Sequence, residues 1–327
     1  PAAARGASMD AAVATAAHDA MLSFYPGEAK TIEDAYVLAL ANVPAGPGRD
    51  AGIATGKAAA VAALAAGGLD PNLPQAIYKP TAIAGKWAPS SLPYDPRDLQ
   101  VRPWFMTSAS QLRIGPPPAL TSATYAASVN ETQARGAKDS KVRSPADTLA
   151  AKFWAFYQMD PPMRQIADQP GRTTVQNARM YALVALASDD VGLMMADGKL
   201  FHAFWRPLNA IRQADSDGND ATSVDPLWEP LLRTPAQPEY PCGHCTAAAV
   251  FSTILAAEGK PPPGGLHFTT EKMPGVSITV PDWPAYAKAV DQSRIDAGVH
   301  FRFTEEASDP AGQQLGRMAL ARLAPLK

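Results

Sequence analysis

The stretch CGHCTAAAVFSTILAAEG, residues 242–259, decides the fold class that we expect for this chain. Almost all of its residues after Cys245 are small or apolar, and Pro241 stands immediately before it. This pattern predicts a buried helix that begins near Cys242. The chain on both sides of this stretch predicts mostly further helices.

Helical patterns cover most of the remaining chain. Ser8 is a typical N-cap for the first helix, Pro26-Gly27 ends it, and Gly67-Gly68 is a C-cap signal after a later Ala-rich segment. β-branched alternation predicts one small hairpin within residues 267–280, around Met273-Pro274-Gly275. The expected helices cover residues 8–24, 31–42, 48–66, 122–135, 145–167, 175–196, 199–213, 242–259, 283–299 and 305–323.

Residues 70–120 differ from the rest because they are rich in Pro, Trp and Ser. The segment is longer than an ordinary loop, and its aromatic residues argue against a disordered linker. We therefore expect it to wrap over a helical core. The sequence predicts an all-α fold with long irregular loops in a single domain, residues 1–327, in which residues 1–120 pack on a core of residues 121–327.

Composition narrows the function classes. With 46% hydrophobic residues in 327, the chain can bury a large core, and its formal net charge of −2 does not favour nucleic acid or an acidic membrane surface as a partner. No apolar run approaches the roughly 20 residues that cross a bilayer. The chain opens at Pro1 with neither a basic n-region nor an apolar h-region. We expect a secreted or periplasmic protein if a signal peptide was removed, and a cytoplasmic protein otherwise.

The chain has two cysteines, Cys242 and Cys245, in the string CGHC. Two cysteines cannot form a disulfide scaffold for a chain of this length, so a single local disulfide and a thiol pair both stay open. Disulfide isomerases carry the same string in a βαβ setting, which this chain does not show. A zinc site is disfavoured as well, because only two thiolates are present and four ligands are needed.

Three clusters carry the chemistry. In KLFHAFWRP (199–207), six residues separate the lysine from the arginine, about two helical turns, so both cations should project from one helix face. In YPCGH (240–244), a glycine at a helix start lets backbone N–H groups approach an anion. In SRIDAGVH (293–300), an arginine precedes a histidine near the end of a predicted helix.

Together the clusters predict a pocket for a tetrahedral oxyanion, vanadate or phosphate. Guanidinium groups and a lysine bind its oxygens, one imidazole can bond to the central atom, and the other can move a proton. Taken singly, each motif is more typical of a solvated helix face, a core histidine or a helix cap. The joint order and spacing make the prediction specific. The residues are Lys199, Arg206, His244, Arg294 and His300.

The order Lys-x6-Arg-Pro, Pro-x-Gly-His and Ser-Arg-x5-His resembles the signature of vanadium-dependent haloperoxidases and type-2 phosphatidic-acid phosphatases. The resemblance to the soluble bacterial haloperoxidase branch extends over nearly the whole chain. It includes FWAFYQMDPPMRQIA (153–167), FWRPLNAIR (204–212), DPLWEPLLRTPAQPEYPCGH (225–244), SRIDAGVHFRF (293–303), GPPPALTSATYA (115–126) and the Ala-rich N-terminal helices.

The resemblance implies a helical bundle with the site in its core, and a role for each matching residue. Lys199, Arg206 and Arg294 hold the oxygens of vanadate, or of phosphate or sulfate in its place, and the Gly243 amide donates to another oxygen. His300 is the vanadium ligand, or the nucleophile toward phosphorus, and His244 is the general acid–base. His18 and His267 have no expected role, whereas His202 lies close enough to support the site.

Three departures from the family pattern concern residues around this site. Cys242 stands where the family has a serine that donates to an oxyanion oxygen, and a thiol is a poor donor that peroxide can oxidise. The acidic residue after FWA is replaced by Tyr157, and Asp160 is the candidate to take its place. Gln237 stands where chloride-oxidising members carry an aromatic, which favours bromide or iodide.

Three functions follow from these features. The first is oxidation of halide by hydrogen peroxide at bound vanadate, and the second is hydrolysis of a phosphomonoester through a phosphohistidine at His300. The third is oxyanion binding without catalysis, as a result of the change at Cys242. The sequence leaves a homodimer open.

Overall fold

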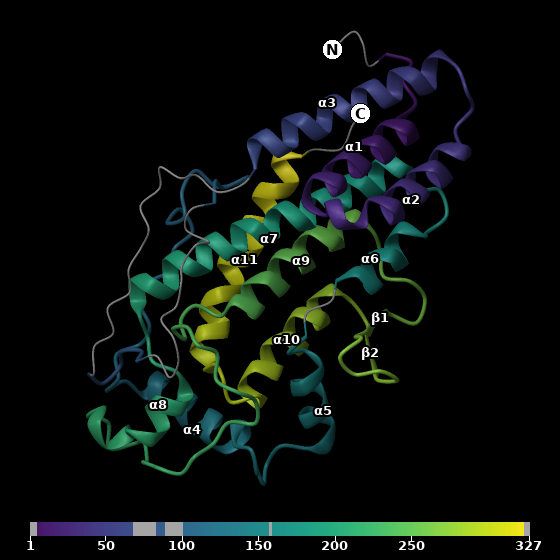
Figure 1. The fold of residues 1–327 in the computed structure, drawn as a ribbon. Helices are drawn as coiled ribbons and strands as arrows, with labels where there is room; N and C mark the ends of the chain where they lie inside the picture. The colour runs from purple at the N-terminus through teal and green to yellow at the C-terminus, as the bar shows by residue number, and fades with distance from the viewer. Residues whose placement is uncertain (1–4, 68–82, 89–100, 157–158, 324–327) are drawn as a thin grey trace. The chain divides into compact units, whose positions relative to one another are not determined.

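The computed structural model describes residues 5–67, 83–88, 101–156 and 159–323 (Figure 1). The described residues are mostly helical, with one two-stranded antiparallel sheet, which confirms the predicted all-α class. Two compact units are distinguished, one of residues 1–70 and 169–182 and the other of residues 71–168 and 183–327. The assignment of one domain stays a prediction.

The first unit contains α1 (Met9–Phe24), the short 3-10 helix η2 (Pro26–Glu28), α2 (Ala29–Ala41) and α3 (Pro47–Ala66). Ser8 caps α1 as predicted, because its hydroxyl accepts a hydrogen bond from the Ala11 amide at 3.3 Å. The core of this unit is small and consists of Ala11, Leu40 and Val43 with their neighbours.

The second unit is built around α9 (Gly243–Glu258), the helix that the sequence singles out. α10 (Trp283–Asp296) and α11 (Arg302–Arg322) both pack on it. α11 can lie close because a Cβ on Gly312 would stand 2.5 Å from the Thr246 carbonyl oxygen. α9 is therefore buried as predicted, and it fixes the residues at its N-terminus.

Shorter elements complete the second unit: α4 (Ala123–Gly136), α5 (Pro145–Phe153), α6 (Asp160–Ala167), α8 (Pro207–Arg212) and the 3-10 helix η4 (Ala214–Ser216). The predicted hairpin is confirmed as β1 (Leu266–Thr269) paired with β2 (Ser277–Val280), with His267 opposite Thr279. The predicted helix over residues 145–167 is wrong in one respect, since α5 and α6 are separate helices.

The prediction that Lys199 and Arg206 share one helix is wrong. α7 (Thr174–His202) continues through residues that we expected to separate two helices, and then it ends. Ala203 has a φ of 48°, and Arg206 is the extended N-cap residue of α8. The reason is local, because Pro207 disfavours a helical conformation for the residue before it.

Aromatic packing holds the irregular segments that flank the site. Tyr125, Phe204, Tyr240, Phe301 and Phe303 are buried in one cluster. Phe301 stacks on Phe303 with ring centroids 5.2 Å apart, and Phe204 meets Phe301 edge-on at 6.3 Å. Three segments that carry site residues are thus anchored to a common core.

Two further findings bear on the predictions. No helix among the described residues is both long enough and apolar enough to cross a membrane. About half of the predicted wrap over residues 70–120, residues 70–82 and 89–100, lies outside the described residues.

Candidate active site

A cavity of about 320 Å³ lies in the second unit and collects the three sequence clusters. Seven of the predicted residues line it, although they come from α7, α9, α10 and the segments between the helices. Among the described residues that line this cavity there is no carboxylate. The lining residues are Ser188, Val191, Gly192, Met195, Lys199, Arg206, Pro235, Gln237, Gly243, His244, Arg294 and His300.

The segment that carries His300 depends on a close backbone contact. α10 ends at Asp296, and Gly298 has a φ of 74°, a conformation that side chains rarely allow. A Cβ on Gly298 would also stand 2.5 Å from the Gly136 carbonyl oxygen. Glycine at this position therefore lets the chain turn from α10 toward the cavity before α11 begins.

Hydrogen bonds fix the tautomer of His300. Its Nε2 lies 3.0 Å from Nη1 of Arg206, and its Nδ1 lies 2.7 Å from Oε1 of Glu239. A guanidinium only donates, so Nε2 accepts, and Nδ1 must carry the ring proton that it donates to Glu239. The lone pair of Nε2 therefore lies on the side of the ring that meets Arg206.

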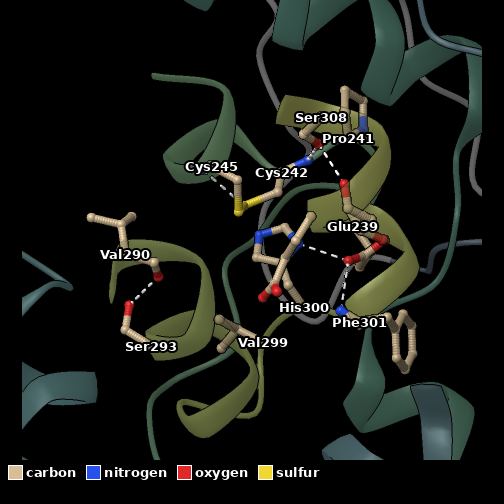
Figure 2. The surroundings of a disulfide bond; sticks show 12 residues. Glu239, Pro241, Cys242, Cys245, Val290, Ser293, Val299, His300, Phe301 and Ser308 are labelled. Carbon is tan, nitrogen blue, oxygen red and sulfur yellow. Dashed lines mark hydrogen bonds and ion pairs between the residues drawn. A yellow bond between two sulfur atoms is a disulfide. The ribbon is translucent and has the colours of Figure 1, made fainter. Parts of the chain in front are cut away.

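Glu239 is the site residue that the sequence analysis missed. Its side chain is completely buried, and besides the imidazole it accepts hydrogen bonds from the Phe301 amide at 3.2 Å and the Thr304 hydroxyl at 2.9 Å. Figure 2 shows this carboxylate beside the His300 ring and the Phe301 backbone. The available signal was a lone acid between Pro238 and Tyr240, two residues before Pro241 of the Pro-x-Gly-His motif.

Arg206 is held in place by the backbone. Its Nε donates to the Gln237 carbonyl at 2.9 Å, and its Nη1 donates to the Val299 carbonyl at 2.8 Å. Burial lowers the pKa of this guanidinium to about 10, with the nearby Glu239 acting against that change. At neutral pH Arg206 is therefore still a cation, and it joins the segments on both sides of the cavity.

Lys199 is buried at the end of α7, and its Nζ donates to three backbone carbonyls. These belong to Pro238 at 2.8 Å, Glu239 at 3.0 Å and Pro241 at 2.6 Å. An ammonium has three hydrogens, so this arrangement uses all of them. Burial and the charge of Arg206 lower the pKa of Lys199 well below its usual value. In this structure Lys199 holds the chain around Glu239; its donation to an oxyanion stays a prediction.

Arg294 differs from the other two cations because part of its guanidinium makes no hydrogen bond to the described residues. The residue is only 4% exposed, yet Nε and Nη1 are buried with no hydrogen-bond partner among the described residues. Burial lowers its pKa to about 10, and the charge of Glu305 acts in the opposite direction. A buried donor without a partner costs free energy, and an anion in the cavity would supply the acceptor.

His244 lies in the first turn of α9, beside the amide of Gly243. Burial, the charge of Arg294 and further cations lower its pKa to about 3, although a hydrogen bond to the backbone of Ala155 acts against this. Its imidazole is therefore neutral at ordinary pH and able to accept a proton. The positive end of the α9 dipole adds to the potential that favours an anion here.

The two cysteines form a disulfide, one of the two possibilities that the sequence left open. Cys242 is the N-cap of α9, with its sulfur facing the Cys245 amide at 3.2 Å, and it does not line the cavity. The expected donation from the Cys242 thiol is therefore corrected, since the bonded sulfur has no hydrogen to donate. The same bond leaves neither cysteine as a thiol that peroxide could oxidise.

The structure does not bring the other supporting residues into the cavity. The His202 ring packs edge-on against Tyr240 at 5.0 Å, and its Nε2 lies 3.2 Å from the Ile114 carbonyl oxygen. Asp160 forms an exposed ion pair with Arg164 on α6 at 2.6 Å, and does not line the cavity. Tyr157 lies outside the described residues.

Vanadate or phosphate fits the residues that are present. Within the described part of the chain, the cavity gathers three cations, no carboxylate, two guanidinium nitrogens without a hydrogen-bond partner, and the amides at the start of a helix. Nε2 of His300, on a ring that lines the cavity, carries a lone pair that could bond to the central atom of an oxyanion. This donor set matches a multiply charged oxyanion better than a bare metal cation, which the neighbouring positive charges would repel.

Part of the chain matches a known family and a curated protein. Residues 179–326 match the family model described as the VCPO second helical-bundle domain. The vanadium chloroperoxidase of Curvularia inaequalis is 31% identical over 148 residues, which covers 36% of this chain and 24% of that protein. The chain thus spans about a quarter of the length of this curated relative.

Solved structures share the fold over nearly the whole chain. A bacterial vanadium-dependent iodoperoxidase has a TM-score of 0.69 at 20% identity, covering 92% of this chain and 76% of that one. An apo-type bacterial vanadium-dependent chloroperoxidase has a TM-score of 0.72 at 18% identity, covering 96% and 82%. Residues 179–326 therefore match the second helical-bundle domain of the vanadium chloroperoxidase family, and the predicted resemblance to vanadium-dependent haloperoxidases is confirmed.

Proposed function

We propose that this chain is a vanadate-binding haloperoxidase, which oxidises halide with hydrogen peroxide. One observation carries the proposal: Arg206, Arg294, His244 and Nε2 of His300 converge on one buried cavity, where two nitrogens of Arg294 have no partner among the described residues. Bound vanadate supplies Lewis acidity toward peroxide without a redox change at the metal.

The residues of this chain have separate tasks in the proposed reaction. Arg294 and Arg206 bind and orient the oxyanion, because guanidinium groups match its oxygens and neutralise its charge. Nε2 of His300 is the ligand to vanadium. The imidazole of His244 is neutral in the free protein, and it accepts a proton from hydrogen peroxide and can return it later. The negative charge of a bound anion would offset the neighbouring cations and raise the pKa of His244 toward the range in which such a transfer is effective.

Gln237 supports a preference for bromide or iodide over chloride. It lines the cavity with Pro235, and the backbone carbonyl of Gln237 also accepts a hydrogen bond from Arg206. A polar side chain at this position leaves the halide partly hydrated, and chloride is the hardest of the three to oxidise. The preference is measured by comparing iodide, bromide and chloride as substrates of the same vanadate-loaded protein.

A second function, phosphomonoester hydrolysis, is favoured by the state of the His300 ring. Nδ1 donates to a buried carboxylate while Nε2 is unprotonated, an arrangement that makes imidazole a better nucleophile. In this reaction Nε2 attacks phosphorus, and His244 protonates the leaving oxygen after the charge of the bound phosphate has raised its pKa and it has taken up a proton from water. Water then hydrolyses the phosphohistidine, in the same cavity and with the same cations.

One experiment separates these functions. The purified protein is loaded with orthovanadate and assayed for bromination of a phenol dye with hydrogen peroxide, in parallel with hydrolysis of para-nitrophenyl phosphate without vanadate. Bromination that requires vanadate supports the first function, and hydrolysis that vanadate inhibits supports the second. Anion binding without either activity means that the chain is an oxyanion-binding protein, and both proposals then fail.

A further inference from the structure

We infer that Glu239 is a positioning residue for His300: its carboxylate keeps the proton on Nδ1 and holds the ring so that Nε2 is the atom available to the cavity. Glu239 is not itself a lining residue. In its application to vanadate this inference rests on the proposed function, whereas the tautomer of His300 can be measured without any anion.

The carboxylate of Glu239 contacts both the His300 ring and the backbone of the next residue. Oε1 lies 2.7 Å from Nδ1 of His300 and also accepts from the Phe301 amide at 3.2 Å. One oxygen thus contacts the side chain of one residue and the backbone of the next, which restricts both the position and the rotation of the ring. Histidine ligands commonly depend on such a carboxylate for their tautomer and orientation.

Glu239 is itself held in place by hydrogen bonds at its backbone and at its side chain. Its amide donates to the Phe204 carbonyl at 2.9 Å, and its own carbonyl accepts from Nζ of Lys199 at 3.0 Å. The second carboxylate oxygen accepts from the Thr304 hydroxyl at 2.9 Å. A side chain fixed at its backbone and at both oxygens can transmit a defined geometry to the imidazole.

Both neighbours of the His300 ring disfavour its alternative tautomer. If Nε2 carried the proton, it would face a donor of Arg206 at 3.0 Å, and Nδ1 would present a lone pair to the carboxylate at 2.7 Å. Both contacts would then be repulsive between side chains that are almost completely buried. The two partners of the ring therefore act together, but only the carboxylate contacts the nitrogen that faces away from the cavity.

A purely structural role for Glu239 makes a different prediction. Phe301 is the N-cap of α11, and Thr304 lies in its first turn, so the carboxylate could simply stabilise the start of that helix. Loss of that role would weaken all anion binding together with stability. Loss of the positioning role would act on vanadate, which bonds to Nε2, far more than on phosphate, which binds through the cations alone.

The experiment compares wild type with Glu239→Gln, Glu239→Leu and the matched control Thr304→Val. Nitrogen-15 NMR of labelled histidine reports which ring nitrogen of His300 carries the proton, and calorimetry measures the binding of orthovanadate and of inorganic phosphate. Glutamine keeps an acceptor for Nδ1 without the charge, whereas leucine removes the acceptor. Thr304→Val removes only the hydroxyl that contacts the other oxygen.

We expect a proton on Nδ1 in wild type, in Thr304→Val and in Glu239→Gln. In Glu239→Leu we expect a mixture of the two tautomers, because only Arg206 then disfavours a proton on Nε2. Orthovanadate affinity should fall about tenfold in Glu239→Gln with phosphate affinity almost unchanged, as is usual when a carboxylate behind a histidine ligand is altered. If Glu239→Leu does not fold, the wild-type tautomer and the two anion affinities of Glu239→Gln decide the question.

Three results overturn the inference: a proton on Nε2 in wild type, equal losses for both anions in Glu239→Gln, or an unchanged affinity for orthovanadate in that variant. A different result concerns the proposed function. If wild type binds orthovanadate no more tightly than phosphate, the proposed bond to His300 is wrong, and the tautomers in wild type and Glu239→Leu alone decide whether Glu239 positions the ring.

Discussion

Nη1 of Arg206 donates to Nε2 of His300 at 3.0 Å, so the cation that should bind an oxyanion covers the nitrogen that should bind its central atom. This hydrogen bond must be exchanged when the anion enters. Nη1 also donates to the Val299 carbonyl and Nε donates to the Gln237 carbonyl, so the planar guanidinium is held on two sides and must shift as a unit, or the His300 ring must shift, for the exchange. Binding of an oxyanion at Nε2 of His300 therefore depends on the position of the Arg206 side chain.

The orphaned nitrogens of Arg294 predict a conflict between stability and function. In Arg294→Met, removal of a buried, poorly paired cation should raise the free energy of unfolding by about 1–3 kcal/mol, the usual cost of a buried polar group without a partner. Affinity for orthovanadate and for phosphate should fall at least a hundredfold. Chemical denaturation and calorimetry measure the two effects. A variant that is less stable than wild type would show that Arg294 is paired in solution.

His244 predicts a stability that depends on pH. Burial and the charge of Arg294 lower its pKa from 6.5 to about 3, so between these values the unfolded chain binds a proton that the folded chain excludes. The contribution to stability is therefore complete above about pH 6.5 and is lost as the pH falls toward 3. His300, whose pKa is also lowered by burial, acts with the same sign.

Glu239 acts with the opposite sign, because burial raises its pKa from 4.5 to about 7, and its contribution is lost as the pH rises through that range. A comparison of wild type with His244→Gln isolates the histidine. The difference in free energy of unfolding between the two proteins should change steadily between pH 6.5 and pH 4, in favour of His244→Gln at the lower pH. A difference that is independent of pH would contradict the low pKa of His244.

The disulfide predicts the effect of restoring a hydroxyl at the start of α9. With the sulfur of Cys242 bonded to Cys245, the N-cap of this helix has no side-chain hydrogen to give an anion. The double variant Cys242→Ser/Cys245→Ala should bind orthovanadate about tenfold more tightly than Cys242→Ala/Cys245→Ala, which is the worth of one hydrogen bond to a charged group. Equal affinities in the two variants would show that position 242 does not reach the anion.

The sequence predicted which residues lie together better than it predicted the path of the chain between them. Their order and spacing match a known signature, and this made the grouping predictable. The residues that line one cavity as expected are Lys199, Arg206, Gly243, His244, Arg294 and His300. The path of the chain between Lys199 and Arg206 was wrong, since helical periodicity carries no information on where a helix stops. That end depends on the positive φ of Ala203 and on Pro207, whose effect a longer helical pattern concealed.

Glu239 and the supporting residues show a second limit. A single acid in a proline-rich segment has no periodic signal, and its partners His300, Phe301 and Thr304 lie some sixty residues further along the chain. Only the tertiary packing of the aromatic cluster brings them together. Asp160 shows the converse: it lies three residues from the expected position Tyr157, but α6 turns it outward to Arg164.

The most direct test of the central claim is a titration of wild type and His300→Ala with orthovanadate, followed by vanadate-dependent oxidation of bromide with hydrogen peroxide. Wild type should gain activity that saturates as vanadate is added, and His300→Ala should gain none, while both still bind phosphate through Arg206 and Arg294. Equal vanadate-dependent activity in the two proteins would contradict the assignment of His300, and with it the proposed site.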